Sequence, residues 1–154
     1  MQITRQADYA VRAVLYLAKH EAGARISTGQ IAREQNIPLT FLAKIVSQLS
    51  AAGILHTTRG ARGGVALARS ADEISLLEIV EAIDGPVMLN QCAVDPDQCP
   101  LGDECVVRNV WCEAQVDLVK RLAQTKFGQL VVAGGNGGAA ALTAASPPAC
   151  PRPP

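Results

Sequence analysis

Apolar side chains recur every three or four positions over residues 4–20. This spacing predicts a first helix, with Thr4 placed to cap its start and Gly23 to end the segment. The apolar positions that would face the core are Ile3, Ala7, Val11, Val14, Leu15 and Ala18.

Two shorter helical patterns follow, separated by only a few residues. Ser27 or Thr28 would cap the first, which ends near Ile37. Pro38 suits the first turn of the second, which ends at Gly53. The inward positions would be Ile31, Ala32, Leu42, Ile45, Val46 and Leu49. Two short helices joined in this way are the pattern of a helix-turn-helix.

A strand–turn–strand pattern comes next. Residues 54–58 alternate and are rich in β-branched side chains, and residues 65–68 form a second apolar stretch. The turn between them is rich in glycine and carries Arg59 and Arg62. A hairpin directly after a helix-turn-helix is a wing, whose glycines let the backbone approach phosphates while its arginines supply positive charge.

The rest of the pattern predicts two more helices and a tail. Ser75 would begin one helix, ended by Gly85. A long final helix would run from about residue 103 to about residue 132 with one apolar stripe. The stripe residues are Val107, Trp111, Ala114, Leu118 and Leu122. Because little of the chain is left to cover this stripe, we expect it to pack against its copy in a second subunit.

The predicted fold class is therefore mainly α with a small β-hairpin wing. Residues 1–85 would form a winged helix-turn-helix DNA-binding region, and residues 86–132 a cysteine loop followed by a long dimerisation helix. Residues 133–154 lack core-forming side chains, which predicts a disordered Gly/Ala/Pro tail.

The net charge of zero conceals an asymmetry between the two parts of the chain. Residues 1–70 hold nine Lys/Arg and three Asp/Glu, a balance of +6, whereas residues 71–132 hold four and eleven, a balance of −7. A basic N-terminal part fits a polyanion such as double-stranded DNA. The chain has no signal sequence and no apolar run of membrane-spanning length, so we expect a cytoplasmic protein without a membrane partner.

Three of the five cysteines lie in a segment interrupted by prolines and a glycine, with the spacing C-x6-C-x5-C. These are Cys92, Cys99 and Cys105. Thiolates prefer zinc, Cu(I) or iron–sulfur clusters, and cytosolic cysteines are kept reduced, so metal or redox chemistry is favoured over disulfides. Buried structural thiols are the plain alternative.

A structural zinc would need a fourth ligand, for which Cys112 is one candidate. If the final helix has begun by Cys105, the two cysteines are seven residues apart, which corresponds to roughly 10 Å along the axis. That separation is too large for neighbouring ligands of one zinc, so a four-cysteine site requires a later helix start. An enzyme is disfavoured, because the sequence has no glycine-rich nucleotide loop, no nucleophile with a histidine base at motif spacing, and few aromatic residues.

Four segments in this order resemble a family of winged-helix iron–sulfur transcriptional regulators that includes the nitric-oxide sensor NsrR and the regulator IscR. They are ITRQADYAVRAVLYLA, IAREQNIPLTFLAKIVSQLSAAGIL, RGARGGVALAR and CPLGDECVVRNVW. The resemblance covers residues 1 to about 130. It implies a homodimer on a palindromic operator, with one cluster per subunit bound by the three loop cysteines.

The resemblance also bears on the fourth ligand. The IscR type uses a histidine three residues after the third cysteine, where this chain has Arg108. The NsrR type uses an aspartate of the first helix from the partner subunit, and Asp8 stands at that place. The alternative is a surface ion pair between Asp8 and Arg12. The resemblance favours a [4Fe–4S] cluster. The first cysteine spacing is one residue longer than in the family, which leaves a [2Fe–2S] cluster open.

The expected DNA contacts come from the helix-turn-helix and the wing. They are Ser27, Thr28, Gln30, Pro38, Leu39, Thr40, Lys44, Arg59, Arg62, Gly63 and Gly64. Leu39 and Phe41 would anchor the recognition helix, while Thr40 and Lys44 would read bases. Contact with phosphate alone is the alternative for Lys44. The function predicted is a repressor that senses nitric oxide or redox and cluster status. The alternative is a winged-helix regulator with a zinc or thiol-redox cysteine site and no cluster.

Overall fold

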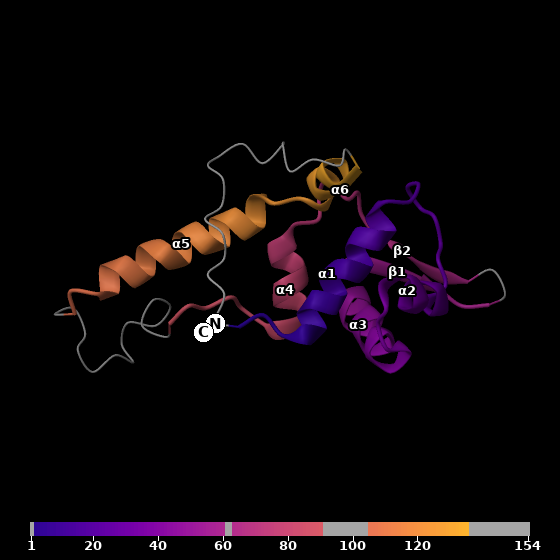
Figure 1. Ribbon diagram of the computed structural model, residues 1–154, viewed down its shortest axis with the longest axis horizontal. Coiled ribbons are helices and arrows are strands. Elements are labelled where there is room, and N and C mark those ends of the chain that lie inside the picture. Colours follow the sequence, from indigo (N-terminus) through magenta and orange to yellow (C-terminus); the bar gives the residue numbers. More distant parts are fainter. Residues whose placement is uncertain (1, 61–62, 91–104, 136–154) are drawn as a thin grey trace.

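Five of the helices and a β-hairpin form one body from which α5 extends (Figure 1). The computed structural model describes residues 2–60, 63–90 and 105–135. Its elements are α1 (Arg5–Ala18), α2 (Thr28–Gln35), α3 (Leu39–Ala51), β1 (Leu55–Thr58), β2 (Gly64–Leu67), α4 (Leu76–Asp84), α5 (Arg108–Gln124) and α6 (Phe127–Gly135). The predicted fold class, mainly α with a small hairpin, is confirmed. In the described part of the chain, no helix is long and apolar enough to span a membrane.

Helix α1 begins at its predicted cap. The Thr4 hydroxyl accepts a hydrogen bond from the Ala7 amide at 3.2 Å and donates to Asp84 at 2.6 Å, which joins the start of α1 to the end of α4. The buried face of α1 is richer in alanine than the apolar spacing predicted. It consists of Ala7, Ala10, Ala13, Val14 and Leu17. Ile3 was predicted to face inward, but it precedes the helix and is 45% exposed.

Helices α2 and α3 form the predicted helix-turn-helix. The Ser27 side chain caps α2, and Asn36 ends it in the left-handed conformation at φ 51°. Pro38 stands at the N-cap position of α3. All six predicted inward positions of the two helices are buried. These side chains hold the two helices against α1 and fix the angle between them.

The wing is an antiparallel hairpin in which Thr58 pairs with Gly64 and Leu55 with Leu67. Its base is joined to the start of α2, because Ile26 and Val65 exchange two backbone hydrogen bonds of 3.0 and 2.8 Å. A Cβ at Gly63 would lie 2.2 Å from the Thr58 carbonyl oxygen. One at Gly64 would lie 2.9 Å from the Ile26 carbonyl oxygen. Folding of the hairpin therefore explains both glycines without reference to DNA.

Helix α4 starts with a capping box formed by Ser75 and Glu78. Partial burial opposes the charged form of the Glu78 carboxylate, but hydrogen bonds from the Ser75 amide, Arg69 and the Ser75 hydroxyl outweigh it. Together with the charge of Arg69, they lower the pKa of Glu78 to about 2.

Acid titration should therefore weaken the fold through Glu78. A carboxylate with a lowered pKa stabilises the folded state above its ordinary value of 4.5, and this contribution is lost as pH falls toward about 2. Since the side chain is 37% exposed, solvent screening limits the contribution to roughly 1 kcal/mol. Denaturant unfolding should show Glu78→Gln less stable than wild type at neutral pH and nearly equal to it in acid. The same difference in unfolding free energy at neutral pH and in acid would contradict this role of Glu78.

The predicted single final helix is wrong. Helix α5 begins at Arg108, several residues later than expected, and ends at Gln124. The chain then bends, and Thr125 and Lys126 pair with the segment before α4: the Thr125 carbonyl accepts from Leu76 at 2.9 Å, and the Phe127 amide donates to Ile74 at 3.1 Å. This pairing interrupts the helix although no glycine or proline marks the break.

After the bend, α6 covers the core. Phe127 is completely buried, and Gly128 lies so close to Asp72 that a Cβ would be 1.8 Å from its carboxylate. The tail predicted from residue 133 starts too early, because α6 continues to Gly135. The remainder of that tail lies outside the described residues.

Candidate DNA-reading face and cysteine region

The outer face of α3 is free for contact with DNA. Thr40, Ala43 and Lys44 are exposed there, on the side opposite the buried Leu42 and Ile45. Of the other predicted contacts, Ser27, Gln30 and Pro38 are exposed near the start of α2 and in the turn, and Thr28 is half-buried. The predicted contacts of the helix-turn-helix are thus exposed, except for the half-buried Thr28.

Leu39 and Phe41, which were predicted to anchor the recognition helix, are not buried in the core. Their exposed fractions are 55% and 52%, because the first turn of α3 projects beyond the core. Phe41 instead contacts the Tyr9 ring of α1 edge-on, with centroids 6.4 Å apart. Leu39 remains a predicted DNA contact.

In the wing, Arg59 is exposed at the end of β1, whereas Arg62 lies outside the described residues. Removing the Arg59 charge should weaken binding to all DNA sequences alike. The slope of log affinity against log salt should become shallower by about 0.9 for each phosphate that the protein no longer neutralises. Titrations of Arg59→Ala at several salt concentrations measure this slope.

Lys44→Ala is the matched control for Arg59, since it also removes one exposed cation. If Lys44 reads a base edge, its loss should change the preference among DNA sequences more than the salt slope. An unchanged affinity and slope in Arg59→Ala would remove the wing from DNA binding.

Asp8 lies on the exposed side of α1 and is 59% exposed. Its carboxylate is 3.7 Å from the Arg12 guanidinium, which is long for a hydrogen bond. The ion pair that sequence spacing offered as the alternative is therefore present, but it is loose. Arg12 also donates to the Gln35 carbonyl at the end of α2 and lies over the Tyr9 ring, 5.7 Å from its centroid. Spacing predicted the ion pair but not the bond to Gln35, which is 23 residues away.

The cysteine region is described only at its end. Cys92 and Cys99 lie outside the described residues, while Cys105 and Cys112 are free and half-buried. Cys112 was disfavoured as a ligand on the expectation of a helix by Cys105, and this expectation is wrong because α5 starts at Arg108. Among the described residues, no three His, Cys, Asp or Glu side chains lie together as a metal site.

Gln115 of α5 fixes one end of this region. Its side chain donates to the Val87 carbonyl at 2.6 Å and accepts from the Leu89 amide at 2.8 Å. The stretch after α4 is thereby held along α5. Figure 1 shows α5 beginning at its outer end, away from the body that contains α1. The start of α5, which Cys105 precedes, therefore lies away from α1.

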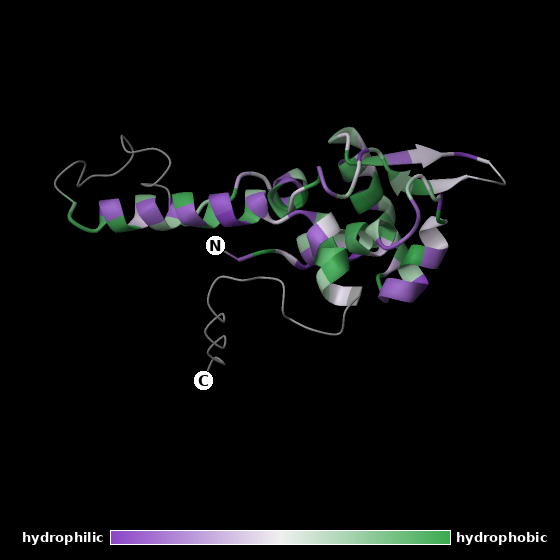
Figure 2. Cartoon of the chain, turned by 90° about the horizontal axis from the view of Figure 1, so that it is seen from above, coloured by the Kyte–Doolittle hydropathy of each residue, from purple (hydrophilic) through white to green (hydrophobic). Residues whose placement is uncertain are grey.

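Helix α5 has no buried residue in the single chain. Its apolar side chains, together with two that precede it, are exposed or half-buried, and Figure 2 shows hydrophobic and hydrophilic residues mixed along the extended helix. Those with the largest exposure are Val106, Val107, Val110, Trp111 and Val116. An exposed apolar surface of this kind is typical of a protein–protein interaction site.

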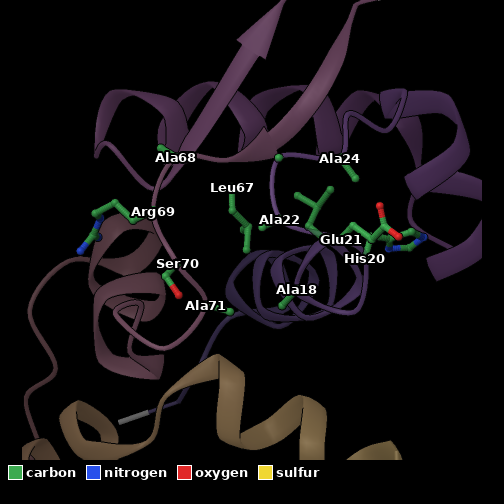
Figure 3. Close-up of a pocket in the computed structure, with 12 residues that line it drawn as sticks. Ala18, His20, Glu21, Ala22, Ala24, Leu67, Ala68, Arg69, Ser70 and Ala71 are labelled. Carbon is green, nitrogen blue, oxygen red and sulfur yellow. The ribbon is translucent and has the colours of Figure 1, made fainter.

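A cavity of about 380 Å³ lies between the end of α1 and the base of β2 (Figure 3). Its walls are mostly small and apolar, including Ala18, Leu67 and Ala71. Arg69 at its edge is bonded to Glu78 at 2.7 Å. The cavity is thus separate from the reading face of α3 and from the cysteine region.

Known proteins share this combination of sequence and fold. Residues 3–133 match the Rrf2 family, described as iron-dependent transcriptional regulators. Protein rrf2 of Nitratidesulfovibrio vulgaris is 30% identical over 122 residues, which cover 79% of this chain and 81% of that protein. The HTH-type transcriptional regulator IscR of Xenorhabdus nematophila is 29% identical over 131 residues, covering 85% and 79%.

A solved structure agrees with these matches. CymR (YrzC), the global cysteine regulator of B. subtilis, has a TM-score of 0.72 at 26% identity, covering 86% of this chain and 97% of that one. The prediction of a DNA-binding regulator rather than an enzyme is confirmed. The chain is a transcriptional regulator and belongs to the Rrf2 family.

Proposed function

We propose that the chain is a homodimeric repressor whose DNA binding depends on an iron–sulfur cluster. Cys92, Cys99 and Cys105 of one subunit would bind the cluster, and Asp8 of the other subunit would complete it. The observation that carries the proposal is the placement of Asp8: an exposed, loosely paired carboxylate on the helix that packs against the reading head.

The residues present fit such a group. Three thiolates with one carboxylate suit cluster iron, and Asp8 needs to give up only a contact of 3.7 Å to take part. Because α5 begins away from the body that contains α1 (Figure 1), an Asp8 from a second subunit is favoured. We favour a [4Fe–4S] over a [2Fe–2S] cluster.

The second subunit would be another copy of this chain, paired along α5. The exposed apolar residues of α5 would be buried there, as expected for an obligate homodimer. In this arrangement Gln115 would hold the base of each cysteine region beside the dimer helix. Such a dimer matches a palindromic operator whose half-sites lie about 34–36 Å apart.

When bound, the cluster would supply iron that reacts with nitric oxide or oxidants, and the carboxylate-bound iron would be the weaker point because a carboxylate is harder than a thiolate. Asp8 would hold α1 of one subunit to the cysteine region of the other. Releasing Asp8 would free the reading heads to change their spacing and so weaken binding to two half-sites at once.

A second candidate is a regulator that uses zinc or thiol oxidation without a cluster. The likeness to CymR, described as a cysteine regulator, favours this candidate. So does the start of α5 after Cys105, because Cys112 can then serve as the fourth ligand. In this case Asp8 would have no part beyond its pair with Arg12.

Anaerobic purification separates the two. The proposal predicts a coloured dimer with broad visible absorption, iron and sulfide, which releases operator DNA when nitric oxide is added. A colourless, zinc-loaded dimer that binds the same DNA would overturn the cluster and support the second candidate.

A further inference from the structure

The exposed face of α1 is joined to the turn of the helix-turn-helix by side chains next to Asp8. Arg12, one helical turn after Asp8, donates to the Gln35 carbonyl at the end of α2. The following residue, Asn36, adopts the left-handed conformation that turns the chain toward α3. Arg12 therefore contacts the backbone at the point where the direction of the recognition helix is set.

A second connection runs through aromatic rings. The Arg12 guanidinium lies over Tyr9, and Tyr9 contacts Phe41 in the first turn of α3. Phe41 is thus exposed, but it contacts Tyr9 of α1 outside the core. The two routes meet at Arg12 and reach both sides of the α2–α3 turn.

Arg12 contacts its two acceptors, the Gln35 carbonyl and the Asp8 carboxylate, at different distances. Its bond to Gln35 is close, whereas its pair with Asp8 is 3.7 Å long and more than half of the Asp8 side chain is exposed. A carboxylate that engages another group would leave the guanidinium to the Gln35 carbonyl alone. A carboxylate that returns would compete for it, because the planar guanidinium has one fixed set of donor directions.

We propose that Arg12 is the positioning residue that couples Asp8 to the recognition helix of its own chain. This inference rests on the proposed function, in which Asp8 is engaged by the partner's cysteine region. With Asp8 engaged, Arg12 holds the α2–α3 turn in the DNA-binding position. With Asp8 released, Arg12 is shared between the Asp8 carboxylate and the Gln35 carbonyl, and the α2–α3 turn loosens.

The test measures operator affinity with and without the cluster and compares their ratio among variants. For wild type we expect a ratio within the usual range of about 5–150 for coupled sites. Arg12→Ala should keep the cluster spectrum while this ratio falls toward one. Arg12→Lys keeps the charge but lacks the planar fork, so its ratio should also fall while its salt dependence stays normal. If Arg12→Ala does not fold, the affinity ratio of Arg12→Lys decides the test.

Gln6→Ala is the matched control. Gln6 also joins α1 to α3, through a bond of 2.5 Å to Gln48, but it does not contact Asp8. Its replacement should lower stability and leave the ratio unchanged. Amide exchange gives a second reading: removing the cluster should speed exchange at Asn36 and Ile37 in wild type and not in Arg12→Ala.

The two proposals fail differently. A wild-type protein with no cluster, or with a ratio of one, overturns the proposed function. A wild-type ratio retained by both Arg12 variants with an intact cluster overturns the role of Arg12 alone.

Discussion

Replacing Cys105 by alanine should give a folded dimer that no longer retains iron. Cys105 lies before α5, outside the core and outside the apolar face of that helix, so its replacement removes a ligand without removing packing. The same result is expected for Cys92→Ala and Cys99→Ala. Iron and sulfide analysis after anaerobic purification measures the metal content, and size-exclusion chromatography checks the dimer.

Cys112→Ala is the matched control, because Cys112 is also a free, half-buried thiol but lies one turn inside α5. It should keep its iron, as should Cys150→Ala. Equal loss of metal from Cys112→Ala would contradict a three-cysteine site and indicate four cysteine ligands.

Asp8→Ala should keep a cluster on three thiolates but lose it faster in air, and its DNA binding should depend less on the cluster. The reason is that the subunits would no longer be joined through α1. The ratio of operator affinities with and without the cluster should fall from the range of about 5–150 toward one. Asp8→Cys should hold the cluster longer and respond more slowly to nitric oxide, because a thiolate is the softer ligand.

A purely structural Asp8 predicts a different result, namely a loss of stability of only a few tenths of a kcal/mol and a normal response. Arg12→Ala is not a suitable comparison for that case, since Arg12 also binds Gln35 and contacts Tyr9. Asp8→Asn is better, because it keeps the shape of the side chain and removes its charge. A wild-type nitric-oxide response in Asp8→Ala would remove Asp8 from the cluster.

Much of the fold could be predicted because local chemistry and tertiary structure agree. Ser27 and Ser75 cap the helices that they were expected to cap, and the glycines of the turn allow the hairpin to close. The core of the helix-turn-helix was predicted because its side chains are large and aliphatic. The alanine face of α1 was missed in part, since alanine is equally common on exposed helix surfaces.

The break between α5 and α6 could not be read from the sequence. It depends on two hydrogen bonds to residues about 50 positions earlier, which no local pattern encodes: the Thr125 carbonyl accepts from the Leu76 amide, and the Phe127 amide donates to the Ile74 carbonyl. The same applies to Arg12, whose partner at Gln35 belongs to another helix. The pairing of Asp8 with cysteines depends on a second subunit, so the sequence of one chain offers it only through family resemblance.

Mixed dimers test this pairing most directly. One subunit carries Asp8→Ala with all cysteines intact, and the other carries Cys105→Ala with Asp8 intact; two different affinity tags isolate the mixed species. If Asp8 acts across the dimer, the mixed dimer contains one complete site. It should then retain half of the wild-type iron with wild-type resistance to air. If Asp8 served its own subunit, the retained cluster would be as labile as in Asp8→Ala. That outcome would contradict the cross-subunit site.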